Sequence, residues 1–437
     1  MYSVQTLLRS LAQGEHDAAL AALYALDGTD SSLAAARTRA LRVAEGFQTN
    51  FCPGGEARPA ALFSGPGRTE IGGNHTDHQH GCVLAGAVNL DTVAAVARSE
   101  RGAIRVLSEG YPLCEVSLSE LEAVPAEAGT TKALIRGIAA RFAALGHAPV
   151  AFDAYVTSTV LPGSGLSSSA AFEVLIGVIL NHLGSCGLTA PEIAQVGQYA
   201  ENVYFGKPCG LMDQTASAVG NIIGIDFADP AHPKIQPVAF DFASCGYSLC
   251  IIDSGASHSD LTDCYAAITE ELKTVCRVFG KAVLRDVPED EFYARLGEVR
   301  QAAGDRAALR AIHVYEDNKR VRLQLRALEN DNFPAFLEYV KESGDSSWMY
   351  LQNVIPEGRT ARQEVAFALA LAKHLLGGHG ACRVHGGGFA GTIQAFVPNE
   401  QLEEFRGGIE AVLGEGSCHV LSIRPEGGIL AEVCSHD

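Results

Sequence analysis

The most informative stretch of this chain is Leu161-Pro162-Gly163-Ser164-Gly165-Leu166-Ser167-Ser168-Ser169-Ala170. Closely spaced glycines let the backbone approach a ligand, and the apolar residues that follow at 172–183 are typical of a buried helix. Unpaired N–H groups and the dipole at the start of such a helix favour an anion, and a serine hydroxyl there can add a ligand to Mg²⁺. The stretch therefore indicates phosphate binding, with a plain glycine–serine turn and a serine N-cap as the alternative. It is not a P-loop, because no Gly-Lys-Ser or Gly-Lys-Thr follows.

Strands and helices alternate around this loop. A half-buried strand is predicted between 151 and 159, where Phe152, Ala154 and Val156 alternate with more polar neighbours. The mixture indicates an α+β protein with two lobes, whose boundary falls near 230–237. Further strands are expected at 60–64, 83–88, 92–97, 247–253 and 393–397, and long amphipathic helices at 261–279 and 361–376.

The N-terminal segment differs from the rest in being rich in Ala and Leu at helical spacing, from 6 to 47. A turn at 28–32 breaks this pattern and supplies an N-cap, so two helices are expected. Glycines and prolines at 52–59 predict a surface linker. We expect the helical segment to pack on the body of the protein or to mediate self-association, because it carries none of the motifs described here.

Bulk properties exclude several function classes. The chain has 437 residues, is 47% hydrophobic and carries a formal net charge of -18, which disfavours nucleic acid or an anionic membrane as the main partner. No signal-peptide pattern opens the chain, and no apolar run reaches membrane-spanning length. The 12 cysteines are scattered without a Cys-x-x-Cys pair and are expected to be reduced and mostly buried. A cytoplasmic location is expected.

A second glycine-rich stretch is Gly386-Gly387-Gly388-Phe389-Ala390-Gly391. It contains the pattern Gly-x-Gly-x-x-Gly of dinucleotide-binding turns. A strand-like segment follows at 392–397, however, whereas a Rossmann turn must open a helix, so that interpretation fails. A glycine-rich hairpin beside a ligand and a structural turn remain as alternatives.

A third stretch, residues 65–81, places Arg, His and Asp side chains between glycines, which suits a hydroxyl-rich ligand. The spacing of His75, Asp77, His78 and His80 also allows a transition-metal site and hence a metallohydrolase. No second ligand cluster of matching type supports that alternative. A solvated polar loop is the third possibility.

Together these segments resemble the galactokinases of the GHMP kinase superfamily. Residues Gly67–His78 follow the family signature Gly-Arg-Val-Asn-Leu-Ile-Gly-Glu-His-Thr-Asp-Tyr with several changes, and Gly163–Ala170 match its phosphate loop intact. Residues Pro208–Gln214 match Pro-Cys-Gly-Ile-Met-Asp-Gln, and Gly386–Gly391 match Gly-Gly-Gly-Phe-Gly-Gly with Ala390 in one glycine position. Order and spacing agree from about Arg58 to the C-terminus, and four ordered motifs are far more specific than one.

The resemblance implies the two-lobed GHMP α+β fold with the active site between the lobes. A helical extension is expected at 1–50, an ATP-binding N-terminal domain at 58–235 and a C-terminal domain at 236–437. The implied reaction moves the γ-phosphoryl group of ATP, with Mg²⁺, onto C1 of galactose or a close analogue. A sugar and ATP are thus the expected partners, and the sequence leaves the oligomeric state open.

The resemblance also implies roles for individual residues. Asp213 corresponds to the family aspartate that acts on the sugar hydroxyl as a base or an orienting charge, and Arg68 is its cationic partner. Ser169 and Glu201 match the positions that hold Mg²⁺. Without the family, Glu201 and Tyr265 would be interpreted as an ordinary helix carboxylate and a core aromatic. The positions matching sugar contacts are Asn74, His75, Asp77, Gly210 and Tyr265, and those matching ATP contacts are Gly163, Ser164, Gly165, Leu166, Ser167, Ser168, Ser169, Ala170, Gly387 and Gly388.

Departures from the family concern the sugar side of the site. Asn74 replaces the family Glu that sits near the C6 hydroxyl, His78 replaces a Tyr, and the residues after Tyr265 are apolar rather than basic. A neutral Asn can donate to a C6 carboxylate, so galactose is expected with relaxed discrimination at C6 and galacturonate as the main rival. A regulator that binds sugar and ATP without kinase activity is the alternative from another class. The intact phosphate loop and Asp213 favour the enzyme.

Overall fold

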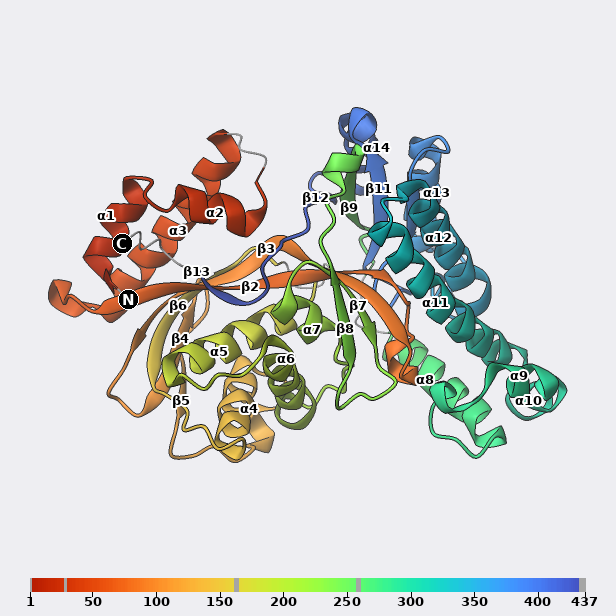
Figure 1. Ribbon diagram of the computed structural model, residues 1–437, viewed down its shortest axis with the longest axis horizontal. Coiled ribbons are helices and arrows are strands. Elements are labelled where there is room, and N and C mark those ends of the chain that lie inside the picture. The colour runs from red at the N-terminus through yellow and green to blue at the C-terminus, as the bar shows by residue number, and fades with distance from the viewer. Residues whose placement is uncertain (1, 27–29, 161–164, 257–260, 432–437) are drawn as a thin grey trace.

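Two β-sheets organise the protein in the computed structural model, which describes residues 2–26, 30–160, 165–256 and 261–431. Among these residues the larger sheet has nine strands, in the order β1-β2-β3-β6-β4-β5, with β13 beside β2, β7 beside β3 and β8 beside β7 (Figure 1). Its long central strands absorb the strands expected at 60–64, 83–88 and 92–97, the last two as parts of a single strand. The bounds are β1 Tyr2–Ser3, β2 Pro59–Gly72, β3 Cys82–Arg98, β4 Ala103–Ser108, β5 Cys114–Ser117, β6 Phe152–Ser158, β7 Ile222–Asp226, β8 Lys234–Val238 and β13 Ile429–Ala431.

Helices cover both faces of this sheet. Along β3, Ala94 and Val96 pack against the helices α4 to α7, and Val93 and Ala95 pack against the N-terminal helices α1 to α3 (Figure 1). The helix expected at 172–183 is confirmed as part of α5. The bounds are α1 Val4–Ala12, α2 Asp17–Tyr24, α3 Asp30–Phe51, α4 Thr131–Ala144, α5 Ser168–Gly184, α6 Ala190–Tyr199 and α7 Met212–Val219.

The N-terminal segment forms three helices in its described part, where two were predicted. The additional break follows α1, where Gly14 adopts a φ of +74° and the N–H of Glu15 bonds to the carbonyl of Ser10 at 3.0 Å. A left-handed glycine at this point ends a helix. The segment packs on the body of the protein, as one of the two alternatives for it predicted.

This packing also corrects the prediction of a half-buried strand at β6. Its second face lies beneath α3, where the ring of Tyr155 lies against Gly46. Asp153 on the same face is buried and ion-paired with Arg58 and Arg105 at 2.7 and 2.6 Å. The alternation of polar and apolar residues therefore marks two different buried surfaces and not a solvent face.

The second sheet is antiparallel and lies in the other half of the molecule (Figure 1). Its order is β10-β11-β9-β12, with β10 Ala381–Val384, β11 Thr392–Pro398, β9 Tyr247–Asp253 and β12 Cys418–Leu421. The strands expected at 247–253 and 393–397 are confirmed, as are the helices at 261–279 and 361–376. The helices of this half are α8 Thr262–Val278, α9 Glu289–Ala294, α10 Leu296–Ala303, α11 Asp305–Glu329, α12 Phe333–Ser346, α13 Glu364–Leu376 and α14 Leu402–Leu413.

The two halves are joined through the polar ends of β2, β10 and β11. The amide of Gln394 on β11 donates to Thr69 Oγ1 at 2.7 Å and to the carbonyl of Glu70 at 3.1 Å. Helix α11 also contacts β2, β3, β7 and β8. Within the described ranges, no helix is long and apolar enough to cross a membrane.

Candidate active site

A bidentate ion pair between Arg68 and Asp213 lies at the junction of the halves. Arg68 is on β2 and Asp213 is in the first turn of α7; Nε donates to Oδ1 and Nη2 to Oδ2, both at 2.7 Å. Nη1 donates to the carbonyl of Gly165, and the backbone N–H of Arg68 donates to the carbonyl of Leu166 at 3.0 Å. Fork-to-carboxylate pairing of this kind fixes geometry as well as charge. Burial alone would raise the pKa of Asp213, but the Arg68 charge and its hydrogen bonds hold that pKa below its ordinary value.

The described part of the phosphate loop runs directly into α5. Gly165 adopts a φ of +72°, and a Cβ there would lie 2.6 Å from Thr392 Oγ1, so a glycine is required on both counts. Helix α5 begins at Ser168, and the N–H groups of its first turn have no partner within the helix, which makes an anion site. Leu166, Ser167, Ser169 and Ala170 complete the described loop, while Gly163 and Ser164 lie outside the described residues.

Beside this loop, Ser169 and Glu201 face each other, with Ser169 Oγ donating to Glu201 Oε1 at 3.3 Å. Lys207 Nζ lies 3.3 Å from the same oxygen, and Gln214 Nε2 donates to Glu201 Oε2 at 2.8 Å and to Glu173 Oε2 at 2.9 Å. Burial and the Glu201 charge raise the pKa of Glu173 well above its ordinary value. Among the described residues, no group of three or more His, Cys, Asp or Glu side chains is placed to hold a metal ion. A hydroxyl and a carboxylate next to a phosphate site nevertheless fit Mg²⁺, which takes few protein ligands and completes its shell with phosphate and water.

A cavity of about 200 Å³ opens next to the ion pair. Of the residues expected to contact sugar or ATP, Arg68, His75, Asp77, Gly210, Asp213 and Gly387 line it. Residues to which the sequence analysis assigned no contact line it too, among them Glu70, Lys207, Pro208, Cys209 and Met212.

Three of the expected sugar contacts, Asp77, His75 and Gly210, are held in place by their neighbours. A Cβ on Gly210 would overlap Asp77 Oδ2, so only glycine lets that carboxylate occupy its position. His75 Nε2 lies 2.9 Å from the carbonyl of Gly387. Burial and the neighbouring His78 lower the pKa of His75 to about 4, so the ring is neutral at pH 7 and its Nε2–H donates to that carbonyl.

Tyr265 lies behind the glycine loop. Its hydroxyl donates to the carbonyl of Gly388 at 2.7 Å, and a Cβ on Gly387 would lie 2.8 Å from its ring. A Cβ on Gly388 would overlap the backbone of Asn353. These contacts fix the path of the loop.

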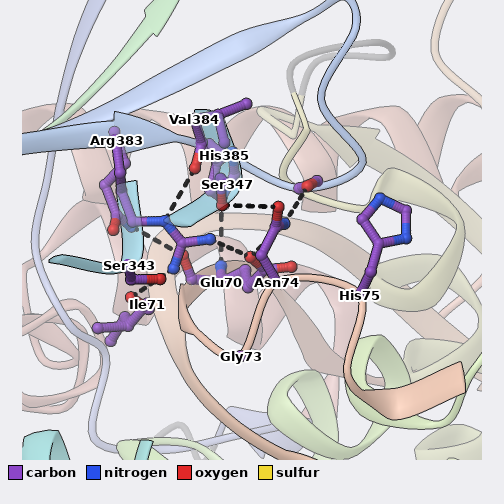
Figure 2. A network of polar contacts seen from close by, with 12 residues as sticks. Glu70, Ile71, Gly73, Asn74, His75, Ser343, Ser347, Arg383, Val384 and His385 are labelled. Carbon is purple, nitrogen blue, oxygen red and sulfur yellow. Dashed lines mark hydrogen bonds and ion pairs between the residues drawn. The ribbon is translucent and has the colours of Figure 1, made fainter. Parts of the chain in front are cut away.

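Asn74 is completely buried and its amide is hydrogen-bonded to protein groups (Figure 2). Nδ2 donates to Glu70 Oε1 at 2.9 Å and to the carbonyl of Gly386 at 2.6 Å. Oδ1 accepts from Asn353 at 2.7 Å and from Ser347 at 3.3 Å. This geometry leaves the amide of Asn74 without a hydrogen-bonding position for a sugar.

Buried residues of β2, of β10 and directly after β10 that the sequence analysis did not name form the wall behind the cavity. Arg383 Nη2 donates to Glu70 Oε1 at 2.6 Å, and His385 Nε2 accepts the backbone N–H of Glu70 at 3.1 Å (Figure 2). Burial and the charge of Arg68 lower the pKa of His385 well below its ordinary value, so the ring is neutral and its Nδ1–H donates to Thr392 Oγ1 at 2.8 Å. The sequence could have drawn attention to Glu70, because this residue departs from the family signature, which has Asn at that position.

Comparison with known proteins gives the class of this fold. A family model described as GHMP kinases N terminal domain matches residues 133–221, and one described as Galactokinase galactose-binding signature matches residues 45–98. The crystal structure of Lactococcus lactis galactokinase complexed with galactose is similar, with a TM-score of 0.75 and 23% identity over 88% of this chain and 98% of that chain. The mevalonate kinase of Methanococcus jannaschii has a TM-score of 0.58 and 14% identity over 84% of this chain and 99% of that chain. The architecture is the two-lobed fold of GHMP kinases.

Curated relatives narrow the class further. A galactokinase of Glaesserella parasuis is 32% identical over 369 residues, which span 82% of this chain and 90% of that protein. A galactokinase of Streptomyces coelicolor is 32% identical over 346 residues, which span 78% and 85%. The chain belongs to the galactokinase family and is a phosphotransferase.

Proposed function

We propose that the protein transfers the γ-phosphoryl group of ATP to the C1 hydroxyl of galactose or a close neutral analogue. The observation that carries this proposal is the Arg68–Asp213 pair, which faces a cavity of about 200 Å³ and is hydrogen-bonded to the loop that opens α5. A sugar in the cavity brings a hydroxyl to Asp213, and the start of α5 holds the phosphates next to it.

Positioning and charge stabilisation account for the chemistry. Phosphoryl transfer needs little covalent participation by the protein. Because the pKa of Asp213 is lowered, its carboxylate is ionised at neutral pH and acts first as an acceptor that orients the attacking hydroxyl. Arg68 keeps Asp213 ionised and stabilises negative charge that develops on the transferred group.

Mg²⁺ is proposed to bind at Ser169 and Glu201. It would supply charge neutralisation at the phosphates. The hydrogen bonds from Lys207 and Gln214 orient Glu201 for that role.

The charges of the cavity favour a neutral sugar over galacturonate. Glu70, Asp77 and Asp213 all line the cavity, whereas the lining cations Arg68 and Lys207 are paired with Asp213 and Glu201. A uronate carboxylate would therefore meet carboxylates without a free cation among the described residues. The buried amide of Asn74 gives galacturonate no further support.

The deciding experiment measures ADP release with Mg²⁺ and ATP against galactose, galacturonate, fucose, arabinose, N-acetylgalactosamine and glucose. We expect galactose to be the best substrate and Asp213→Ala to lower kcat by roughly 10²–10⁴-fold while ATP still binds. Glu201→Gln should raise the Mg²⁺ concentration needed for half-maximal rate. Binding of sugar and ATP without ADP release by the unmodified protein would establish the regulator instead.

A further inference from the structure

Glu70 lies on the same wall of the cavity as the reacting pair. It follows Arg68 by two positions on β2, and both side chains line the cavity. Pairing with β3 is regular between them, opposite Ala87 and Ala85. Alternate residues of a regular strand share a face and lie about 7 Å apart. This separation is comparable to the breadth of a pyranose ring, so a sugar whose reacting hydroxyl meets Asp213 extends towards Glu70.

The two carboxylate oxygens of Glu70 have different surroundings. Oε1 accepts from Asn74 Nδ2 at 2.9 Å and from Arg383 Nη2 at 2.6 Å (Figure 2). Arg383 is completely buried, and its other nitrogens donate to the carbonyls of Ile71 and Val384, both at 2.9 Å. Within the described part of the chain, no hydrogen bond reaches Oε2. Burial raises the pKa of Glu70, and the charge of Arg383 opposes that shift. The ion pair with Arg383 and the hydrogen bond from Asn74 fix one oxygen of Glu70 and leave the other for a ligand.

Glu70 places a carboxylate at a position where the galactokinase signature has a neutral residue. That signature has Asn where this chain has Glu70, and Glu where this chain has Asn74. The two residues touch, so exchanging them keeps an amide-to-carboxylate hydrogen bond and moves the charge from the loop to the strand, beside Arg383. The amide of Asn74 fits its place because Nδ2 meets the carbonyl of Gly386, which a carboxylate would repel.

We propose that Glu70 determines sugar specificity: its Oε2 accepts a hydrogen bond from a galactose hydroxyl remote from C1, while Asn74 and Arg383 hold the carboxylate in place. This proposal rests on the proposed function. Strand β2 would then carry both Arg68, which pairs with the carboxylate that orients the reacting hydroxyl, and Glu70, which recognises the far side of the ring.

The test compares galactose with its 2-, 3-, 4- and 6-deoxy analogues for the unmodified enzyme and for Glu70→Gln. For the unmodified enzyme, one remote deoxy analogue should lose roughly 10- to 100-fold in kcat/KM, the effect of a hydrogen bond to a charged group. In Glu70→Gln, kcat/KM for galactose should fall towards the value for that analogue, so that the enzyme no longer discriminates between the two. The ratios of kcat/KM among the other sugars should stay unchanged. A uniform loss for every sugar, or persistence of the discrimination, would overturn the proposal.

Two further variants separate recognition from folding. Glu271→Gln removes a carboxylate paired with Arg306 and Arg310 outside the cavity, and it should leave the ratios between sugars unchanged. Glu70→Asp keeps a carboxylate beside Arg383 but withdraws it from the cavity by one methylene, and it takes the place of Glu70→Gln if that variant does not fold; the same discrimination should be lost. Calorimetric binding of the same sugars reads out the recognition step independently. If the unmodified protein phosphorylates none of them, the proposed function fails and the binding ratios alone decide the role of Glu70.

Discussion

At the scale of single residues, the chemistry depends on how neighbours tune a few charged groups. Burial disfavours the charged form of Asp213, and Arg68 outweighs burial because it is paired at 2.7 Å through two hydrogen bonds. The pKa values of His75 and His385 are lowered as well, but for a histidine a lowered pKa favours the neutral form. Burial is the largest cause of both shifts.

The Arg68–Asp213 pair predicts the acid limb of the pH–rate profile. The lowered pKa keeps Asp213 ionised through the mildly acidic range, so kcat/KM should not lose its orienting carboxylate until the pH falls through that lowered value. In Arg68→Met the largest opposition to burial is removed, so the pKa of Asp213 should rise and the acid limb should move to higher pH, with kcat reduced by roughly 10²–10³-fold. The profile of Arg277→Met, which removes an exposed arginine, should match that of the unmodified enzyme. An acid limb at the same pH in Arg68→Met would show that the pair does not set it.

Gly210 provides a second test at this scale. In Gly210→Ala the new methyl group overlaps Asp77 Oδ2 and displaces that carboxylate from the cavity. We expect KM for sugar to rise by about tenfold or more while KM for ATP changes little. Gly407→Ala is the control, since nothing lies within 4 Å of a Cβ at that helical position. Equal kinetics in the two variants would mean that Asp77 does not contact the sugar.

At the scale of elements, the N-terminal helices act as the cover of the large sheet. Asp91 on β3 accepts hydrogen bonds from Tyr24 on α2 at 3.0 Å and from Arg424 near the C-terminus at 3.0 Å, and it is also paired with Arg39 on α3. The apolar surface around this network includes Phe47, which is completely buried. The helices therefore stabilise the sheet from the face opposite α5 and the phosphate loop.

Stability and catalysis should consequently separate in this region. Phe47→Ala should lower the free energy of unfolding by about 3–5 kcal/mol through lost burial and a cavity, and leave KM for ATP unchanged. Denaturant unfolding monitored by circular dichroism measures the first quantity and steady-state kinetics the second. Phe367→Ala, at a side chain that is 54% exposed, should cost far less. A change in KM for ATP in folded Phe47→Ala would show coupling between the cover and the active site.

At the scale of the whole molecule, buried ionic groups join the halves. Asp317 on α11 accepts the N–H of Asn74 at 3.0 Å and is paired with Arg320 at 3.0 Å. Burial alone would raise the pKa of Asp317, but the charges of His313, Arg383 and Arg320 lower it. Contacts between α11 and the loop after β2 thus depend on an ionised carboxylate.

Acid should weaken this junction. A lowered folded-state pKa contributes stability that is present above the unfolded value of about 3.9 and is lost as the pH falls through the folded value. Asp91 and Asp213 behave alike, whereas Glu70 and Glu173, whose pKa values are raised, act in the opposite direction. Asp317→Asn should lower the free energy of unfolding by about 3 kcal/mol at pH 7. Its free energy of unfolding should also fall less steeply on acidification than that of the unmodified protein, as measured by urea unfolding from pH 7 to pH 3. An unchanged pH slope in this variant would contradict the role given to Asp317.

Patterns along the chain were sufficient to predict the local elements and the family. Alternation predicted β6, a run of apolar residues predicted α5, amphipathic spacing predicted α13, and the ordered motifs predicted the GHMP fold, because each of these signals comes from neighbours along the chain. The motifs also named Arg68 and Asp213, which the structure joins although they are 145 positions apart.

Which side chains face the cavity depends on how distant segments of the chain pack together. Asn74 and Tyr265 match family positions, yet Asn353 and Gly386 engage the amide of Asn74, and the glycine loop engages Tyr265. Glu70 lines the cavity because Arg383, from the other sheet, compensates its buried charge. Burial and pairing between distant segments set the energy of a charged group, and no local pattern records which distant segment will lie beside it.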